Sequence, residues 1–156
     1  LGVHGYWHNA LRRAFFADLT LADIQATTRG IAAALARRGL SAAPVPYYRP
    51  PFGFHTRAMR RGVTSAGVTL VTWGVSVTDW PRWRAVDDIV APILARVRAG
   101  DIIVLHDGNN LAPHSQQTCV DHPALAGAVQ ALIVALRARG LEPAPLALVL
   151  ADGAAG

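Results

Sequence analysis

The chain contains no lysine, one glutamate (Glu142) and one cysteine (Cys119) among its 156 residues. A single cysteine excludes an intrachain disulfide and any metal site built from several cysteines. All 15 basic residues are therefore arginines, and the 10 acidic residues leave a net charge of +5. The arginines occur as scattered pairs without interleaved aromatic residues, which we ascribe to base composition rather than to nucleic-acid binding. We expect no nucleic-acid partner.

Long apolar runs are also missing. None approaches the roughly 20 residues of a membrane-spanning helix, and no charged segment followed by an apolar one marks a secretory leader. The chain starts in what looks like the end of a strand, at residues 1–3. We therefore expect a fragment, or a mature domain cut within its fold. Hydrophobic residues make up 52% of the sequence, which is ample for a core.

Segments of helical and strand type alternate along the chain. We predict helices over 20–38, 55–66, 86–99 and 123–139, and strands over 1–4, 45–48, 68–77, 102–105 and 146–150. Residues 20–23 (Thr-Leu-Ala-Asp) resemble a capping box at the start of the first helix. This alternation indicates βα units on a parallel sheet, either doubly wound or closed as a barrel.

Two histidines, His4 and His8, directly follow the first predicted strand. Imidazole suits zinc and related divalent ions. A catalytic zinc typically has three protein ligands and a water, so this pair needs a third ligand, ordinarily a carboxylate. The alternative is that both histidines are structural or solvated.

Further candidates fall at or just after the ends of later strands, the edge where α/β folds build their sites. His106 can act as a general acid or base, or simply mark a strand end. Asp79 can hold a histidine in one orientation, or form a turn. Arg49 precedes two prolines whose rigid backbone can aim it at a carboxylate. We find no persuasive partner for the other three histidines and treat them as surface residues: His55, His114 and His122.

Four short segments, in this order, resemble motifs of the polysaccharide deacetylase family (carbohydrate esterase family four, the chitooligosaccharide-deacetylase homology domain). Residues 4–8 (His-Gly-Tyr-Trp-His) resemble its paired-histidine metal motif, and residues 49–53 (Arg-Pro-Pro-Phe-Gly) its third motif. Residues 76–80 (Ser-Val-Thr-Asp-Trp) resemble the fourth motif, and 104–106 (Val-Leu-His) the fifth. The resemblance extends over nearly the whole chain.

This resemblance implies an α/β fold, a distorted (β/α) barrel that here lacks its first strand and helix. It assigns residues 1–150 to a deacetylase-like catalytic domain without the first family motif, followed by a flexible tail at 151–156. The implied reaction is metal-dependent removal of N- or O-acetyl groups from a polysaccharide or oligosaccharide such as peptidoglycan or chitin. The implied metal is zinc, and the implied location is secreted or in the cell envelope. The oligomeric state is not indicated.

The resemblance also implies a role for each matched residue. His4 and His8 bind the metal, whose water attacks the acetyl carbonyl. His106 is the general acid, Asp79 holds and tunes it, and Arg49 orients the catalytic base. The backbone near Phe52 helps to hold the oxyanion. The expected substrate-binding residues are Pro51, Phe52, Gly53, Trp80 and Leu105.

The sequence departs from the family pattern in several places. The first motif, an aspartate pair that supplies the base and the third metal ligand, has no counterpart before His4. Gly5 stands where the family usually has serine or threonine, Asn9 where proline is common, and Ser76 where an aspartate is usual. We therefore expect little or no activity from this chain alone. The alternatives are a non-catalytic glycan-binding relative, a related hydrolase of small amides, or an α/β domain with coincidental motifs.

Overall fold

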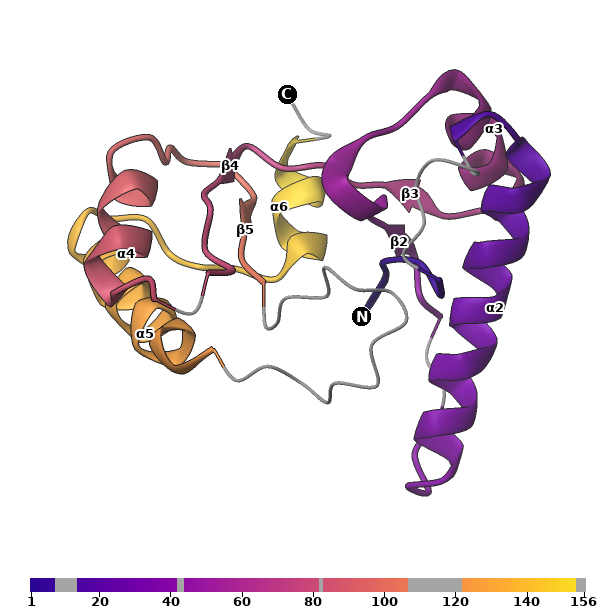
Figure 1. Cartoon of the computed structure of the whole chain (residues 1–156), viewed down its shortest axis with the longest axis horizontal. Coiled ribbons are helices and arrows are strands. Elements are labelled where there is room, and N and C mark those ends of the chain that lie inside the picture. The colour runs from indigo at the N-terminus through magenta and orange to yellow at the C-terminus, as the bar shows by residue number, and fades with distance from the viewer. Residues whose placement is uncertain (8–13, 42–43, 82, 107–121, 154–156) are drawn as a thin grey trace. The chain divides into compact units, whose positions relative to one another are not determined.

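The computed structural model describes residues 1–7, 14–41, 44–81, 83–106 and 122–153 (Figure 1). They fall into two compact units, Leu1–Thr72 and Trp73–Gly156. Among the described residues, no helix is both long and apolar enough to cross a bilayer.

The first unit is built on a three-stranded parallel sheet in the order β1-β2-β3. β1 (Gly2–Val3) pairs with β2 (Tyr47–Tyr48), and β2 pairs with β3 (Thr69–Leu70). These three strands lie within the segments predicted as strands at 1–4, 45–48 and 68–77. The core of this unit comes from the strands and the helices beside them: Val3, Ile24, Val45, Tyr48 and Val63.

Helix α2 (Ala17–Ala36) connects β1 to β2 (Figure 1). It starts three residues before the predicted capping box, with Phe16 as N-cap. Thr20 and Asp23 lie inside the helix and are fully buried, so the predicted capping box is wrong. The pattern matches a cap in sequence, but tertiary packing places both side chains in the interior.

Helix α3 (Arg57–Ser65) follows the short helix η1 (Pro51–Gly53) and packs closely on α2. Thr56 caps it by accepting the Met59 amide at 3.2 Å. A Cβ built on Gly62 would lie only 2.4 Å from the carbonyl oxygen of Ala17. A glycine at this position therefore lets the two helices approach.

The second unit contains a two-stranded parallel sheet of β4 (Val75–Ser76) and β5 (Ile103–Val104). α4 (Val86–Leu94) connects these strands, and α5 (Pro123–Ala138) packs against α4. The predicted helix over 86–99 is thus shorter than expected. Six buried residues form the core: Val75, Ile89, Val90, Ile93, Ala128 and Leu132.

The last element of this unit is a helix, α6 (Leu146–Gly153). The predicted strand over 146–150 is therefore wrong. The amides of Leu148 and Val149 donate to the carbonyl of Pro145, which begins a helical turn. Leucine and alanine favour helix, and Val149 is the one β-branched residue in the segment. α6 extends into the predicted tail, and residues 154–156 lie outside the described part.

The predicted α/β class is confirmed, because parallel strands alternate with helices in both units. Within the described residues these strands make two sheets rather than one closed barrel. Barrel closure therefore stays a prediction. In each unit the strands run in one direction, so the residues that follow them lie at a common edge.

Candidate active site

Asp79 and His106 meet beyond the carboxyl ends of β4 and β5. The Asp79 side chain is fully buried. Its Oδ1 lies 2.7 Å from His106 Nδ1, and its Oδ2 accepts the backbone N–H of His106 at 2.6 Å. Because a carboxylate only accepts, Nδ1 carries a proton. The His106 side chain remains 34% exposed, so this ring is fixed on one side and accessible.

The charge state of Asp79 depends on two opposing influences. Burial is the largest single one, and by itself it would raise the pKa of the carboxyl. The hydrogen bonds from the ring and backbone of His106, together with the attraction of its charge, act in the other direction. In sum they outweigh burial and lower the pKa of Asp79 below its ordinary value. Asp79 is therefore a carboxylate near neutral pH.

Two more predicted residues lie beside this pair. The ring of Trp80 meets the His106 ring edge-on, with centroids 5.4 Å apart and planes at 86°. Leu105 is half-buried and packs on the core of the second unit. Trp83 is 84% exposed. Trp80 therefore packs against His106, whereas the ring of Trp83 is exposed to solvent.

His122 also reaches this pair, which corrects the expectation that it is a surface residue without a partner. It is half-buried, and its Nε2 donates to the backbone carbonyl of Asp79. Sequence reasoning missed it because the acceptor is a main-chain group 43 residues away. His55 has a partner as well, since its Nε2 lies 2.8 Å from Nη2 of Arg60, but this contact is exposed as expected of a surface residue. His114 lies outside the described residues.

In the first unit, His4 follows β1 and is held by the chain after β2. Its Nδ1 lies 2.8 Å from the carbonyl oxygen of Arg49. A carbonyl can only accept, so Nδ1 carries the proton and the lone pair is on Nε2. Metal-binding histidines commonly donate their second ring N–H to a carbonyl in this way. His4 therefore fits a metal ligand.

The rest of a metal site is not visible in the described part of the chain. His8 lies outside it. Among the described residues, no group of three or more histidine, cysteine, aspartate or glutamate side chains is placed to hold a metal ion. Of the two predicted ligands, only His4 lies in the described residues, and its hydrogen bond to the Arg49 carbonyl fits a ligand role.

Asp23 organises the loop that follows His4. Its Oδ1 accepts the backbone amides of Tyr6 at 3.0 Å and Trp7 at 3.4 Å. Gly5 has a φ of +99°, and a Cβ there would lie 3.0 Å from Asp23 Oδ2. Sequence reasoning missed this residue. No signal in the sequence indicated this role, because the partners of Asp23 are main-chain amides 16 and 17 residues away.

The segment from Arg49 to Gly53 forms a rigid turn after β2. The amide of Arg49 donates to the carbonyl of Val3 at 2.9 Å, and the amide of Gly53 to that of Pro50 at 3.1 Å. Pro51 is buried, whereas the side chain of Phe52 is 69% exposed. Phe52 has a φ of +57°, the one positive value at a non-glycine in the described residues. The turn therefore presents Phe52 outward.

No family model matches the chain. Its sequence is 38% identical over 103 residues to a chitooligosaccharide deacetylase from Bradyrhizobium sp. (strain ANU 289), which covers 64% of this chain and 46% of that protein. The chain thus spans about half the length of this curated relative. Over 64% of its length the chain is thus similar to a chitooligosaccharide deacetylase.

Solved structures show that the chain shares its fold with carbohydrate esterases of family 4. One is a pseudoenzyme from Bacillus anthracis, with a TM-score of 0.75 at 20% identity over 96% of this chain and 45% of that chain. Another is an acetyl xylan esterase from Clostridium thermocellum in complex with a cobalt ion. It gives a TM-score of 0.73 at 20% identity over 96% of this chain and 63% of that chain.

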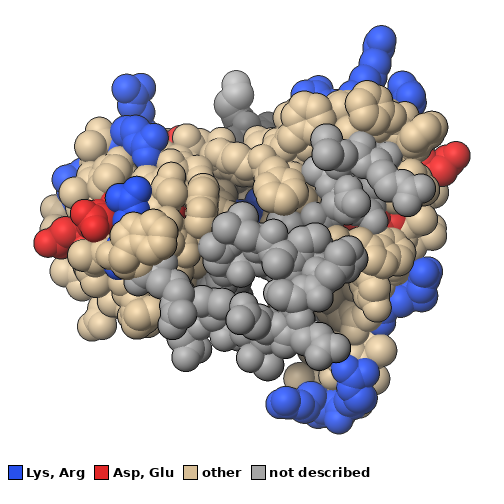
Figure 2. Space-filling model, in the orientation of Figure 1, with Lys and Arg blue, Asp and Glu red and all other residues tan. Residues whose placement is uncertain are grey.

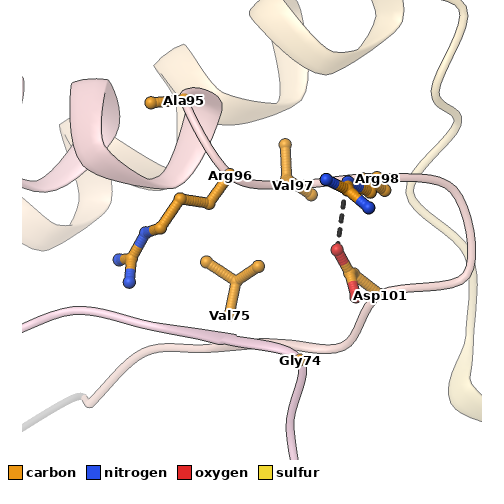
Figure 3. A pocket seen from close by; sticks show the side chains of 7 residues that line it. All are labelled: Gly74, Val75, Ala95, Arg96, Val97, Arg98 and Asp101. Atoms are coloured by element: carbon orange, nitrogen blue, oxygen red, sulfur yellow. Dashed lines mark hydrogen bonds between the residues drawn. The ribbon is translucent and has the colours of Figure 1, made fainter.

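A pocket of about 460 Å³ in the second unit lies away from the Asp79–His106 pair. Figure 3 shows Gly74 before β4, Asp101 before β5, and Arg96 and Arg98 after α4 around it. Asp101 Oδ2 accepts the amide of Arg98 at 2.8 Å. The pocket thus lies at the amino ends of the strands, whereas Asp79 and His106 follow their carboxyl ends.

Charged side chains are dispersed over the visible face of each unit. Figure 2 shows arginines in separate groups rather than in one continuous basic surface. Arg137 forms an ion pair with the single glutamate, Glu142, with Nη2 and Oε1 2.6 Å apart. On this face of the described residues, the arginines thus form no continuous stripe.

Proposed function

We propose that this chain is part of a metal-dependent hydrolase that removes N- or O-acetyl groups from a polysaccharide or oligosaccharide such as chitin or peptidoglycan. In the N-acetyl case it acts on carbon–nitrogen bonds other than peptide bonds. The Asp79–His106 pair is the observation that carries the proposal. A buried carboxylate fixes one ring nitrogen of His106 while the ring stays accessible, as a general acid requires.

His106 acts as the general acid and protonates the leaving nitrogen or oxygen. Asp79 fixes the orientation of the imidazole ring and keeps a proton on its Nδ1. Trp80 and Leu105 wall the acetyl group, and the edge-on contact of Trp80 with His106 supports this role. General acid catalysis of this kind contributes about 10²–10⁴-fold to the rate.

His4 and His8 hold a divalent metal in this proposal, with zinc as the first candidate. When bound, such a metal lowers the pKa of its water and polarises the acetyl carbonyl. The bond from His4 Nδ1 to the Arg49 carbonyl supports a ligand role for His4. The Arg49 side chain orients the base, and the rigid turn of Pro51, Phe52 and Gly53 contacts the substrate.

The resemblance to polysaccharide deacetylases also implies a fold and a cellular location for the protein. The fold is a distorted barrel. The base and the third metal ligand are the aspartate pair of the first family motif, which has no counterpart before His4. The 156-residue chain alone then releases little acetate. The substrate is a cell-wall or other extracellular glycan, which implies secretion or attachment to the cell envelope.

The test measures acetate release from an acetylated chitooligosaccharide by the zinc-loaded natural protein that contains this chain. We expect His106→Ala to lower kcat by about 10²–10⁴-fold. Asp87→Asn is the control, since Asp87 is exposed on α4 and has no part in the proposed site. Full activity of His106→Ala, or no acetate from the unmodified protein on any acetylated glycan, contradicts the proposal.

A non-catalytic glycan-binding protein is the second candidate. Two features favour it: Ser76 replaces the usual aspartate of the fourth motif, and a neighbour in fold is a pseudoenzyme. In that case the natural protein binds an acetylated chitooligosaccharide in calorimetry but releases no acetate, with or without added metal.

A further inference from the structure

His122 connects the Asp79 loop to a packed helix. It is the residue directly before α5, and Pro123 occupies the first helical position. From there its Nε2 donates to the carbonyl of Asp79. α5 is anchored by Ala128 and Leu132, which lie in the core of the second unit. His122 thus ties the main chain at Asp79 to a rigid element.

The other polar groups of Asp79 are bound as well. Its amide donates to the carbonyl of Val77 at 3.1 Å, a contact within the loop itself. Both carboxylate oxygens are engaged by His106. Among the described residues, the hydrogen bond from His122 to the Asp79 carbonyl is therefore the contact that links Asp79 to a helix.

The contacts of the His122 ring select one tautomer. The Asp79 carbonyl only accepts, so Nε2 carries a proton. Nδ1 is buried and has no hydrogen-bond partner among the described residues. A proton on Nδ1 would be a buried donor without an acceptor, which is unfavourable. The ring is therefore held with its proton on Nε2.

We propose that His122 is a positioning residue for His106 and acts through Asp79. The inference rests on the proposed function, in which His106 is the general acid. By holding the Asp79 carbonyl, His122 fixes the loop so that one carboxylate oxygen meets the His106 ring and the other meets its amide. Without His122 the loop can shift, and the carboxylate no longer reaches both groups at once.

Long-range proton–nitrogen NMR spectra of the full 156-residue chain test this arrangement without a change of sequence. We expect the proton of His122 on Nε2 and a proton on Nδ1 of His106 with a strongly deshielded resonance. A His122 ring with its proton on Nδ1 and a bare Nε2 overturns the proposal.

Two variants then separate the hydrogen bond from the volume of the ring. His122→Phe fills the space without a donor, whereas His122→Gln retains an N–H donor. We expect the His106 amide to exchange about tenfold faster in His122→Phe, with loss of the Nδ1 proton signal. His122→Gln retains both. Unchanged His106 signals in His122→Phe, or equally faster exchange at the core amides of Ile89 and Ile93, overturn the proposal.

Kinetics of the natural protein add a readout that general loss of structure does not give. We expect His122→Phe to lower kcat about tenfold with an unchanged KM, and His122→Gln to restore most of it. If the protein deacetylates no glycan, the proposed function fails while the NMR outcome still decides whether His122 positions His106.

Discussion

At the scale of single residues, the carboxylate of Asp79 determines how the His106 ring is oriented and which ring nitrogen carries a proton. Asp79 gives one oxygen to the backbone of His106 and the other to its ring. Both the position and the proton of the ring therefore depend on the same buried group. A substitution of Asp79 should therefore change both the free energy of unfolding and the proposed general-acid function of His106.

We expect Asp79→Asn to be less stable than the wild type near neutral pH by about 1–3 kcal/mol, because charge-assisted bonds are lost. The folded pKa of Asp79 is lowered. Its contribution is therefore fully present above the unfolded value of about 4 and is lost as the pH falls through the folded pKa. Denaturant unfolding of both proteins across the acid range measures this.

The exposed Asp87 of α4 provides the control for this series. Asp87→Asn should stay within about 0.5 kcal/mol of the wild type. A stability difference between Asp79→Asn and the wild type that stays constant into strong acid would contradict the linkage.

Asp23 offers a second residue-scale prediction. It accepts two amides of the loop after His4 while fully buried. We expect Asp23→Ala to cost about 1–3 kcal/mol and to increase hydrogen exchange at Tyr6 and Trp7. Asp18→Ala on the exposed face of the same helix should leave both amides protected, and equal effects of the two variants would refute the role.

At the scale of elements, two glycines of α2 and α3 make a matched pair. Ala17 and Thr20 leave no room for a Cβ on Gly62, whereas the nearest atom to a Cβ on Gly30 is 3.6 Å away. We expect Gly62→Ala to destabilise by about 1–3 kcal/mol. Gly30→Ala should stabilise by up to about 1 kcal/mol. Thermal unfolding distinguishes them, and similar midpoints would contradict close helix packing.

Elements with a clear period could be predicted from sequence, and ambiguous ones could not. The helices at α2, α3 and α5 follow apolar spacing with a glycine after each, and Gly39, Gly67 and Gly140 have positive φ. The run at 146–150 is too short for periodicity to separate strand from helix. Thr20 and Asp23 matched a cap because a local pattern carries no information on what packs against it.

Among the candidate residues, the meeting of Asp79 with His106 could be anticipated, because each follows a parallel strand of one sheet. The contributions of Asp23 and His122 could not. Asp23 binds main-chain amides 16 and 17 residues away, and His122 binds a carbonyl. Main-chain partners leave no signal in the sequence.

At the scale of the whole molecule, metal binding should couple to folding. If His4 is a ligand, zinc at about a hundredfold its Kd stabilises the folded chain by about 2.7 kcal/mol. We expect this as a rise in the unfolding temperature that a chelator reverses. His4→Ala should abolish it, whereas His55→Ala should retain it. An equal zinc effect in His4→Ala would remove His4 from the site.

Gly5 illustrates how a family consensus can fail for an individual sequence. The family usually has serine or threonine there, and a designer who follows the consensus would restore it. In this chain the backbone at position 5 has a φ of +99°, and a Cβ would press on Asp23 and Pro51. The substitution would therefore strain the segment between the two histidines. A side chain at position 5 therefore requires compensating changes in the residues around it, so a single consensus substitution there should destabilise this loop.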